Sequence, residues 1–150
     1  MRTRLLIFAA ILFLAVSAVF SVIRAQDTPA ATSPDHARHS LAVNLLRAIN
    51  TAENDYRCAH NGAYAPWETL VTSPEFTTKG LPWAERMEPA LADAQFATGA
   101  EILPGWRLRL DLTSGGAGYD ALLEDATDTT SGYAVVTDER ALIRECRTVR

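Results

Sequence analysis

The sequence predicts an α+β domain in which one long N-terminal amphipathic helix packs on a four-stranded antiparallel C-terminal meander. Two patterns carry this prediction. Apolar residues recur every three or four positions between residues 33 and 62, which is the spacing of one face of an α-helix. Apolar and polar residues alternate strictly over residues 106–113, as in a strand with one buried face.

The N-terminus predicts export from the cytoplasm. Arg2 and Arg4 precede an uncharged apolar run, Leu5–Ile23, which is long for a signal peptide and close to the length that spans a bilayer. Residues 1–25 are therefore either a cleaved signal peptide or a membrane anchor, and both place the rest of the chain outside the cytoplasm. We expect a periplasmic or secreted domain, or a head held outside the inner membrane through residues 5–23 alone.

The predicted helix begins after a linker, residues 26–33. Pro29 and Pro34 stop a continuous helix from running through this linker. Ser33 is a suitable N-cap, and Asn61-Gly62 is a stop signal. The apolar stripe of the helix consists of Leu41, Leu45, Ile49, Ala52 and Tyr56. Arg38, Arg47, Asn50, Glu53 and Arg57 lie mostly off that stripe.

The middle of the domain reads as irregular. Pro66–Leu70 is expected to form a short helix, and Thr72–Pro82 a loop, because it holds two prolines and a glycine. Trp83–Phe96 has helical composition in pieces, interrupted by Pro89. Pro104-Gly105 is expected to form a turn.

We place the domain at residues 34–150. Its C-terminal third has the pattern of strands. We predict strands at Trp106–Thr113, Tyr119–Glu124, Tyr133–Thr137 and Leu142–Val149. The connections between them are short, so an antiparallel meander is the simplest topology. Its apolar face would cover the helix stripe.

Charge and cysteine content restrict the partners and the redox state. The chain has 18 acidic and 14 basic residues, which argues against a nucleic-acid partner. In an exported domain, Cys58 and Cys146 are candidates for one disulfide between the end of the helix and the last strand, with two buried free thiols as the alternative. His60 lies two residues from Cys58, but side chains at that spacing on a helix point apart.

Two polar clusters contain residue types that bind metal ions. His36 and His39, with Asp35 beside them, lie near the start of the helix, but these are too few ligands for a closed site. Asp125 and Asp128, in a threonine-rich segment, lack the glycine and glutamate of a calcium loop. We therefore expect no metal, no cofactor and no catalytic residues.

Four short motifs occur in an order that resembles the head domain of type IV pilins and pseudopilins. They are LLRAINTAE at residues 45–53, Gly62-Ala63-Tyr64, GWRL at residues 105–108, and a closing hairpin at residues 132–144. The resemblance covers about residues 40–147. It implies a long helix, an irregular middle and an antiparallel meander in a non-enzymatic protein of the cell envelope.

The N-terminus departs from the pilin pattern. It is of the secretory type and lacks a prepilin leader, and no glutamate precedes Glu53. Pro29 and Pro34 also separate the apolar run from the head helix. The resemblance therefore concerns the head and not the filament-forming helix.

We expect the protein to act in assembly or interaction, with an unidentified envelope protein as partner. Long loops on a rigid scaffold often carry binding residues, and the middle segment, residues 63–105, offers Tyr64, Trp67 and Trp83 as interaction candidates. The alternative is a soluble periplasmic or secreted binding module for a small molecule or glycan, with the tryptophans as its platform.

Overall fold

A computed structural model of the chain describes residues 33–129 and 132–147. The predicted signal peptide or anchor over residues 1–25, and all of the predicted linker except Ser33, lie outside the described residues. From Pro34 onward the chain forms one compact unit. Within the described ranges, none of the helices combines the length and the apolar character needed to cross a membrane.

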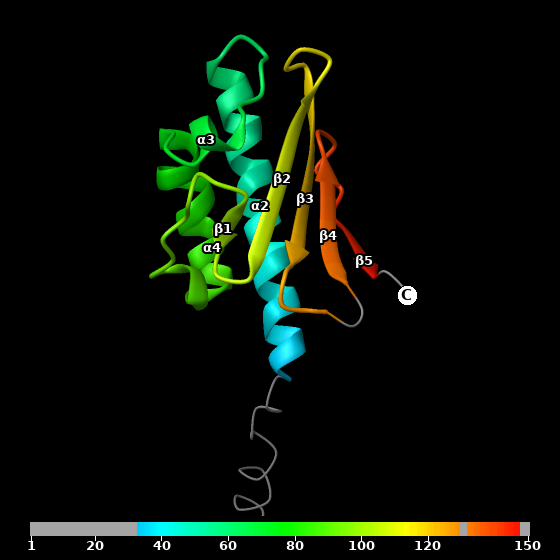
Figure 1. Cartoon of the computed structure of the whole chain (residues 1–150). Helices are drawn as coiled ribbons and strands as arrows, with labels where there is room; N and C mark the ends of the chain where they lie inside the picture. The colour runs from blue at the N-terminus through cyan, green and yellow to red at the C-terminus, as the bar shows by residue number, and fades with distance from the viewer. Residues whose placement is uncertain (1–32, 130–131, 148–150) are drawn as a thin grey trace, which may run out of the picture. The chain divides into compact units, whose positions relative to one another are not determined.

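The predicted long helix is present as α2 (Pro34–Ala59) and runs through the middle of the fold (Figure 1). It starts with Pro34 and places Asp35 in its first turn, where the helix dipole favours a carboxylate. It ends before Asn61 and Gly62, which both have positive φ, and the Gly62 N–H donates to the Arg57 carbonyl at 2.9 Å. This is the helix ending that the Asn-Gly pair predicts.

The sheet is an antiparallel meander of five strands, in the order β1-β2-β3-β4-β5. The strands are β1 (Glu101–Leu103), β2 (Trp106–Thr113), β3 (Gly118–Asp125), β4 (Tyr133–Asp138) and β5 (Arg144–Arg147). The α+β class and the meander are thus confirmed, whereas the predicted number of four strands is wrong.

The extra strand, β1, is not predicted from the sequence because its three residues are too few to show an alternation. It pairs with β2 across the Pro104-Gly105 turn, where Gly105 has a φ of 78°. Ile102 is fully buried and Leu103 nearly so. The packing of these two side chains in the core, and not a local sequence pattern, stabilises β1.

A second helical layer covers the side of α2 that faces away from the sheet (Figure 1). It consists of α3 (Trp67–Leu70), a π-helix η1 (Glu75–Gly80), α4 (Leu81–Met87) and a short 3₁₀ turn η2 (Pro89–Leu91). The loop predicted at Thr72–Pro82 is therefore wrong, because most of it is helical.

The prolines in this layer start helical turns instead of breaking them. Pro74 precedes η1, and Pro82 occupies the first turn of α4, where a missing N–H costs no helical hydrogen bond. The Ser73 hydroxyl accepts the Phe76 N–H at 3.2 Å, which satisfies a donor at the start of η1.

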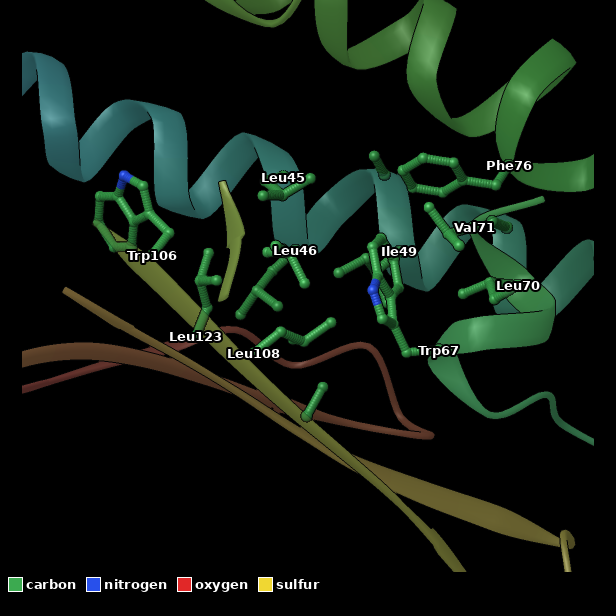
Figure 2. Packing of buried hydrophobic residues seen from close by; sticks show 14 of the residues in the cluster. Leu45, Leu46, Ile49, Trp67, Leu70, Val71, Phe76, Trp106, Leu108 and Leu123 are labelled. Atoms are coloured by element: carbon green, nitrogen blue, oxygen red, sulfur yellow. The ribbon is translucent and has the colours of Figure 1, made fainter. Parts of the chain in front are cut away.

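The core fills the spaces on both sides of α2. Figure 2 shows Leu46, Leu108 and Leu123 together between α2 and the strands. Burial decreases along β2, so that Leu110 is half-buried and Leu112 is 38% exposed. The fully buried β2 face that the alternation predicts is thus limited to its first half, because α2 packs mainly on β4 and β3.

Two polar residues of α2 that were expected off the apolar stripe are buried. The Asn50 amide donates to the Thr137 hydroxyl at 3.0 Å, and its oxygen accepts from the Tyr119 hydroxyl at 2.7 Å. Glu53 is fully buried, and one carboxyl oxygen accepts the Ala65 N–H at 3.0 Å. The covering layers on both sides of α2 are the reason that these residues have no access to water.

Burial makes Glu53 an unusually weak acid. Its second oxygen, Oε1, has no hydrogen-bond partner. Desolvation raises the pKa of the Glu53 carboxyl to about 7, although the hydrogen bond from Ala65 acts in the opposite direction. The folded-state pKa lies above the unfolded one, so this residue favours folding fully at pH below about 4.5, and that contribution is lost as the pH rises through about 7.

We predict that the free energy of unfolding falls by about 3 kcal/mol between pH 5 and pH 8.5 because of Glu53. Glu53→Gln should remove most of this decline, since the amide does not ionise. Urea unfolding at both pH values measures the effect. Glu68→Gln, at an exposed position of α3, is the matched control and should keep the wild-type decline. An equal decline in all three proteins would contradict the assignment.

Candidate functional site

A polar cleft of about 290 Å³ opens at the start of α2. It is built by the first two turns of α2, by the end of β3 and the turn that follows it, and by the end of β5. The residues that line it are Asp35, Arg38, His39, Asp125, Thr127, Asp128 and Arg147.

The cleft joins the two polar clusters that the sequence presents far apart. Asp35, Arg38 and His39 lie three and four residues apart, so that they share one face of α2. Asp125 ends β3, and Asp128 follows in the connection to β4. The packing of α2 on the sheet brings this end of β3 to the first turns of α2, where Arg38 contacts Asp125.

An ion pair between Arg38 and Asp125 forms the centre of the cleft. Arg38 donates from Nε and Nη2 to the two carboxyl oxygens, both at 2.7 Å. Asp125 Oδ1 also accepts the Thr127 N–H at 2.9 Å and the Thr127 hydroxyl at 2.6 Å. Burial opposes ionisation of Asp125, but the hydrogen bonds from Arg38 and Thr127 outweigh it and lower its pKa to about 2.

Aromatic rings pack against Arg38 and its neighbour His39. The Arg38 guanidinium carbon lies 5.0 Å from the centre of the Trp106 ring, and the His39 ring stacks on Tyr133 at 3.7 Å. The Tyr133 hydroxyl donates to Glu145 at 3.2 Å, and burial together with the Glu145 charge raises the pKa of Tyr133. These contacts connect the start of α2 to β2, β4 and β5.

The Asp125 and Asp128 carboxylates of this cleft are engaged in hydrogen bonds within the protein. Asp125 uses both oxygens in hydrogen bonds to Arg38 and Thr127, and the Asp128 carboxyl accepts the Tyr133 N–H at 3.3 Å. In residues 33–129 and 132–147, no three His, Cys, Asp or Glu side chains are placed to hold a metal ion.

An apolar groove lies on the other side of Arg38. Its volume is about 580 Å³, and it runs between α2, the segment after α4, and the turn between β1 and β2. Its lining residues are Arg38, Leu41, Ala90, Asp93, Ala94, Gln95, Leu103, Pro104 and Trp106. Arg38 and Trp106 therefore border this groove, and Arg38 also lines the polar cleft.

The aromatic interaction candidates are largely internal. Tyr64 is 7% exposed and Trp67 is 5% exposed, whereas Trp83 is half-buried against the core. The Trp67 ring meets Phe76 edge-on, and its indole N–H donates to the Ala97 carbonyl at 2.9 Å. Trp67 thus packs within the second helical layer, whereas the Tyr64 ring packs against Tyr119 of β3. Both offer little surface to a partner.

The structure does not bring the two cysteines together. Cys58 and Cys146 are both free and exposed. Cys146 pairs with Ala134, beside the Tyr133 ring that stacks on His39. Along an α-helix the distance from His39 to Cys58 is about 28 Å, whereas a disulfide needs Cα atoms within about 7 Å. The predicted disulfide is therefore contradicted, and so is the alternative of buried thiols.

The chain matches no protein-family model, and neither a search of curated proteins nor one of solved structures gives a significant match.

The Arg38–Asp125 pair was not found from the sequence. Arg38 looks like one more solvated charge on α2, and Asp125 like part of a polar turn. The only local signal is the Asp-Ala-Thr sequence at residues 125–127, which favours a side-chain-capped turn. The pairing depends on how α2 packs on the sheet and has no local signature.

We predict that Arg38→Met lowers the free energy of unfolding at pH 7 by about 1.5–3 kcal/mol, because it leaves a buried carboxylate without its charged donor. The loss should shrink as the pH falls from about 4 towards 2, where Asp125 of the wild type becomes protonated.

Urea unfolding between pH 2 and pH 7 measures this effect. Arg109→Met is the matched control, because Arg109 and its partner Asp111 are both mostly exposed, at 72% and 62%. We expect that control to lose less than about 1 kcal/mol. Equal losses in the two variants would contradict the role of the buried pair.

Proposed function

We propose that this chain is a non-enzymatic bacterial cell-envelope protein, exported from the cytoplasm, whose pilin-like head acts in assembly or protein interaction. The observation that carries the proposal is the order of elements: a long helix, a middle segment of short helical turns, and an antiparallel meander. This is the order that the resemblance to type IV pilins and pseudopilins implies.

The positions of the four motifs support the same proposal. Residues 45–53 form the buried middle of α2, and Gly62 ends that helix. Residues 105–108 start β2, and residues 132–144 cover β4 and the turn into β5. One motif therefore lies in a helix, one ends that helix, and two lie in strands, which supports the proposal.

The chemistry of the polar cleft also favours an assembly role over a reaction. Arg38 and Asp125 bind each other, and their contacts hold α2 on the sheet. We assign the interaction to the exposed surface of the middle segment, residues 63–105, which contributes most of the lining of the apolar groove.

The second candidate is a soluble periplasmic or secreted binding module for a small molecule or glycan. The groove favours it, because its volume of about 580 Å³ falls within the range of ligand sites. Asp93 and Gln95 would supply polar contacts beside the apolar Leu41 and Leu103. An intact mass equal to residues 26–150 in the soluble fraction would favour this candidate over an anchored envelope protein.

We predict that the full chain carries alkaline phosphatase, fused after residue 150, to the outside of the cytoplasm in an active form. The apolar run, Leu5–Ile23, would direct this export. Leu14→Arg, which places a charge in the run, is the control and should abolish phosphatase activity. A parallel β-galactosidase fusion that is fully active, with an inactive phosphatase fusion, would contradict export.

A further inference from the structure

The strand β5 forms one edge of the sheet in the part of the chain that the structure describes. This strand lies at the end of the order β1-β2-β3-β4-β5, with β4 as its neighbour, and all four of its residues are exposed. At the opposite edge, the Ile102 carbonyl of β1 accepts the Ala97 N–H at 3.0 Å. An exposed edge strand presents backbone donors and acceptors that another strand can pair with.

The sheet register fixes which way the β5 side chains point. Glu145 lies opposite Val135, which is fully buried beneath α2, and Arg147 lies opposite Tyr133 on the same face. Cys146 lies opposite Ala134 and points to the other face. Glu145 and Arg147 are therefore neighbours on one face, with Cys146 between them on the other.

Symmetry allows few pairings between two copies of β5. A closed dimer that joins two antiparallel edges has its two-fold axis perpendicular to the sheet, which keeps each face continuous. The axis then passes through one residue that faces its own copy. An axis at Arg144, Glu145 or Arg147 would set two like charges opposite each other.

The axis at Cys146 is different, because it sets Glu145 of each copy opposite Arg147 of the other. We propose that two copies of this chain associate by antiparallel pairing of β5 with β5, with the two-fold axis at Cys146. The pairing forms one continuous sheet, satisfies the open backbone edge and creates two ion pairs between the copies. This inference concerns β5 alone and does not rest on the proposed function.

The surroundings of β5 leave room for this pairing. A groove of about 230 Å³ separates α2 from Glu145 on the inner face of the sheet. The Tyr133 hydroxyl donates to one Glu145 oxygen, Oε2, which leaves Oε1 to accept from Arg147 of the second copy.

The pairing also brings two thiols within bonding distance. Directly opposite residues of antiparallel strands have Cα atoms about 4.5–5.5 Å apart, and a disulfide accepts about 4.4–6.8 Å. Two Cys146 thiols and one glutathione disulfide would give the Cys146–Cys146 disulfide and two molecules of reduced glutathione, by two successive exchange steps. The disulfide serves here as a probe of the register.

The first test uses the full-length chain, purified under reducing conditions in mild detergent and then treated with glutathione disulfide. We expect Cys58→Ser, which retains Cys146, to form a covalent dimer on a non-reducing gel. Cys146→Ser, which retains the equally exposed Cys58, is the matched control and should form no covalent dimer on that gel. Equal yields from the two variants, or no dimer from either, would overturn the proposal.

The second test measures the charge pairs without the thiols. In the Cys58→Ser, Cys146→Ser background, sedimentation equilibrium should show a dimer. Either Glu145→Arg or Arg147→Glu, introduced singly, should increase the Kd of that dimer at least tenfold. The double exchange should restore the original Kd, because it restores opposite charges at both positions. Arg140→Glu, in the exposed β4–β5 turn, makes the same charge change as Arg147→Glu and should have no effect.

Circular dichroism verifies that each variant is folded. A monomer in the thiol-free background would overturn the proposal. The proposal would also be overturned if neither single reversal changed the Kd of the dimer, or if the double exchange did not restore that Kd. Either result would place the interface elsewhere.

Discussion

The rest of the structure depends on the burial of α2 from two sides. The sheet covers one side and the helical layer of the middle segment covers the other, so that the central turns of α2 have almost no contact with water. Every polar group on those turns then needs a partner inside the protein. Asn50 finds two, in Thr137 and Tyr119, whereas Glu53 finds one, in the Ala65 N–H.

The same constraint explains why the ends of α2 are held differently from its middle. At its start, the helix is exposed enough for charged side chains, and the Arg38–Asp125 pair fixes it to the end of β3. Trp106 and Tyr133 support this pair with their rings. Apolar packing positions the middle of the helix, while directed hydrogen bonds position its start, and together they fix α2 on the sheet.

Much of the fold could be predicted because it depends on local periodicity. The apolar stripe gives α2, and the alternation at Trp106–Thr113 gives β2 with its observed bounds. The second helical layer could not be predicted in the same way. Pro74 and Pro82 resemble loop signals. They are compatible with helix only because Pro74 immediately precedes η1 and Pro82 lies in the first turn of α4.

Less of the candidate site could be predicted, because it depends on contacts distant in sequence. Asp35 and His39 on one side, and Asp125 on the other, are visible as polar clusters, but nothing local indicates that they meet. For Trp67, the sequence suggests a role at the surface that the structure does not give it. A tryptophan in an irregular segment suggests an exposed platform, whereas here it packs edge-on against Phe76 inside the core.

Gly80 gives the most direct test of the two-sided burial, because it is where η1 touches α2. A Cβ at this position would lie 2.7 Å from the Ala48 carbonyl oxygen and 3.3 Å from the Ala52 Cβ. Gly99 has no atom within 4 Å of such a Cβ and serves as the control. Urea unfolding of the full chain should show that Gly80→Ala lowers the free energy of unfolding by about 1–3 kcal/mol, as overpacking does. Gly99→Ala should leave it unchanged or slightly raised. If Gly80→Ala stabilises the protein, as alanine does in an uncovered helix, the second layer does not pack on α2 and the account is wrong.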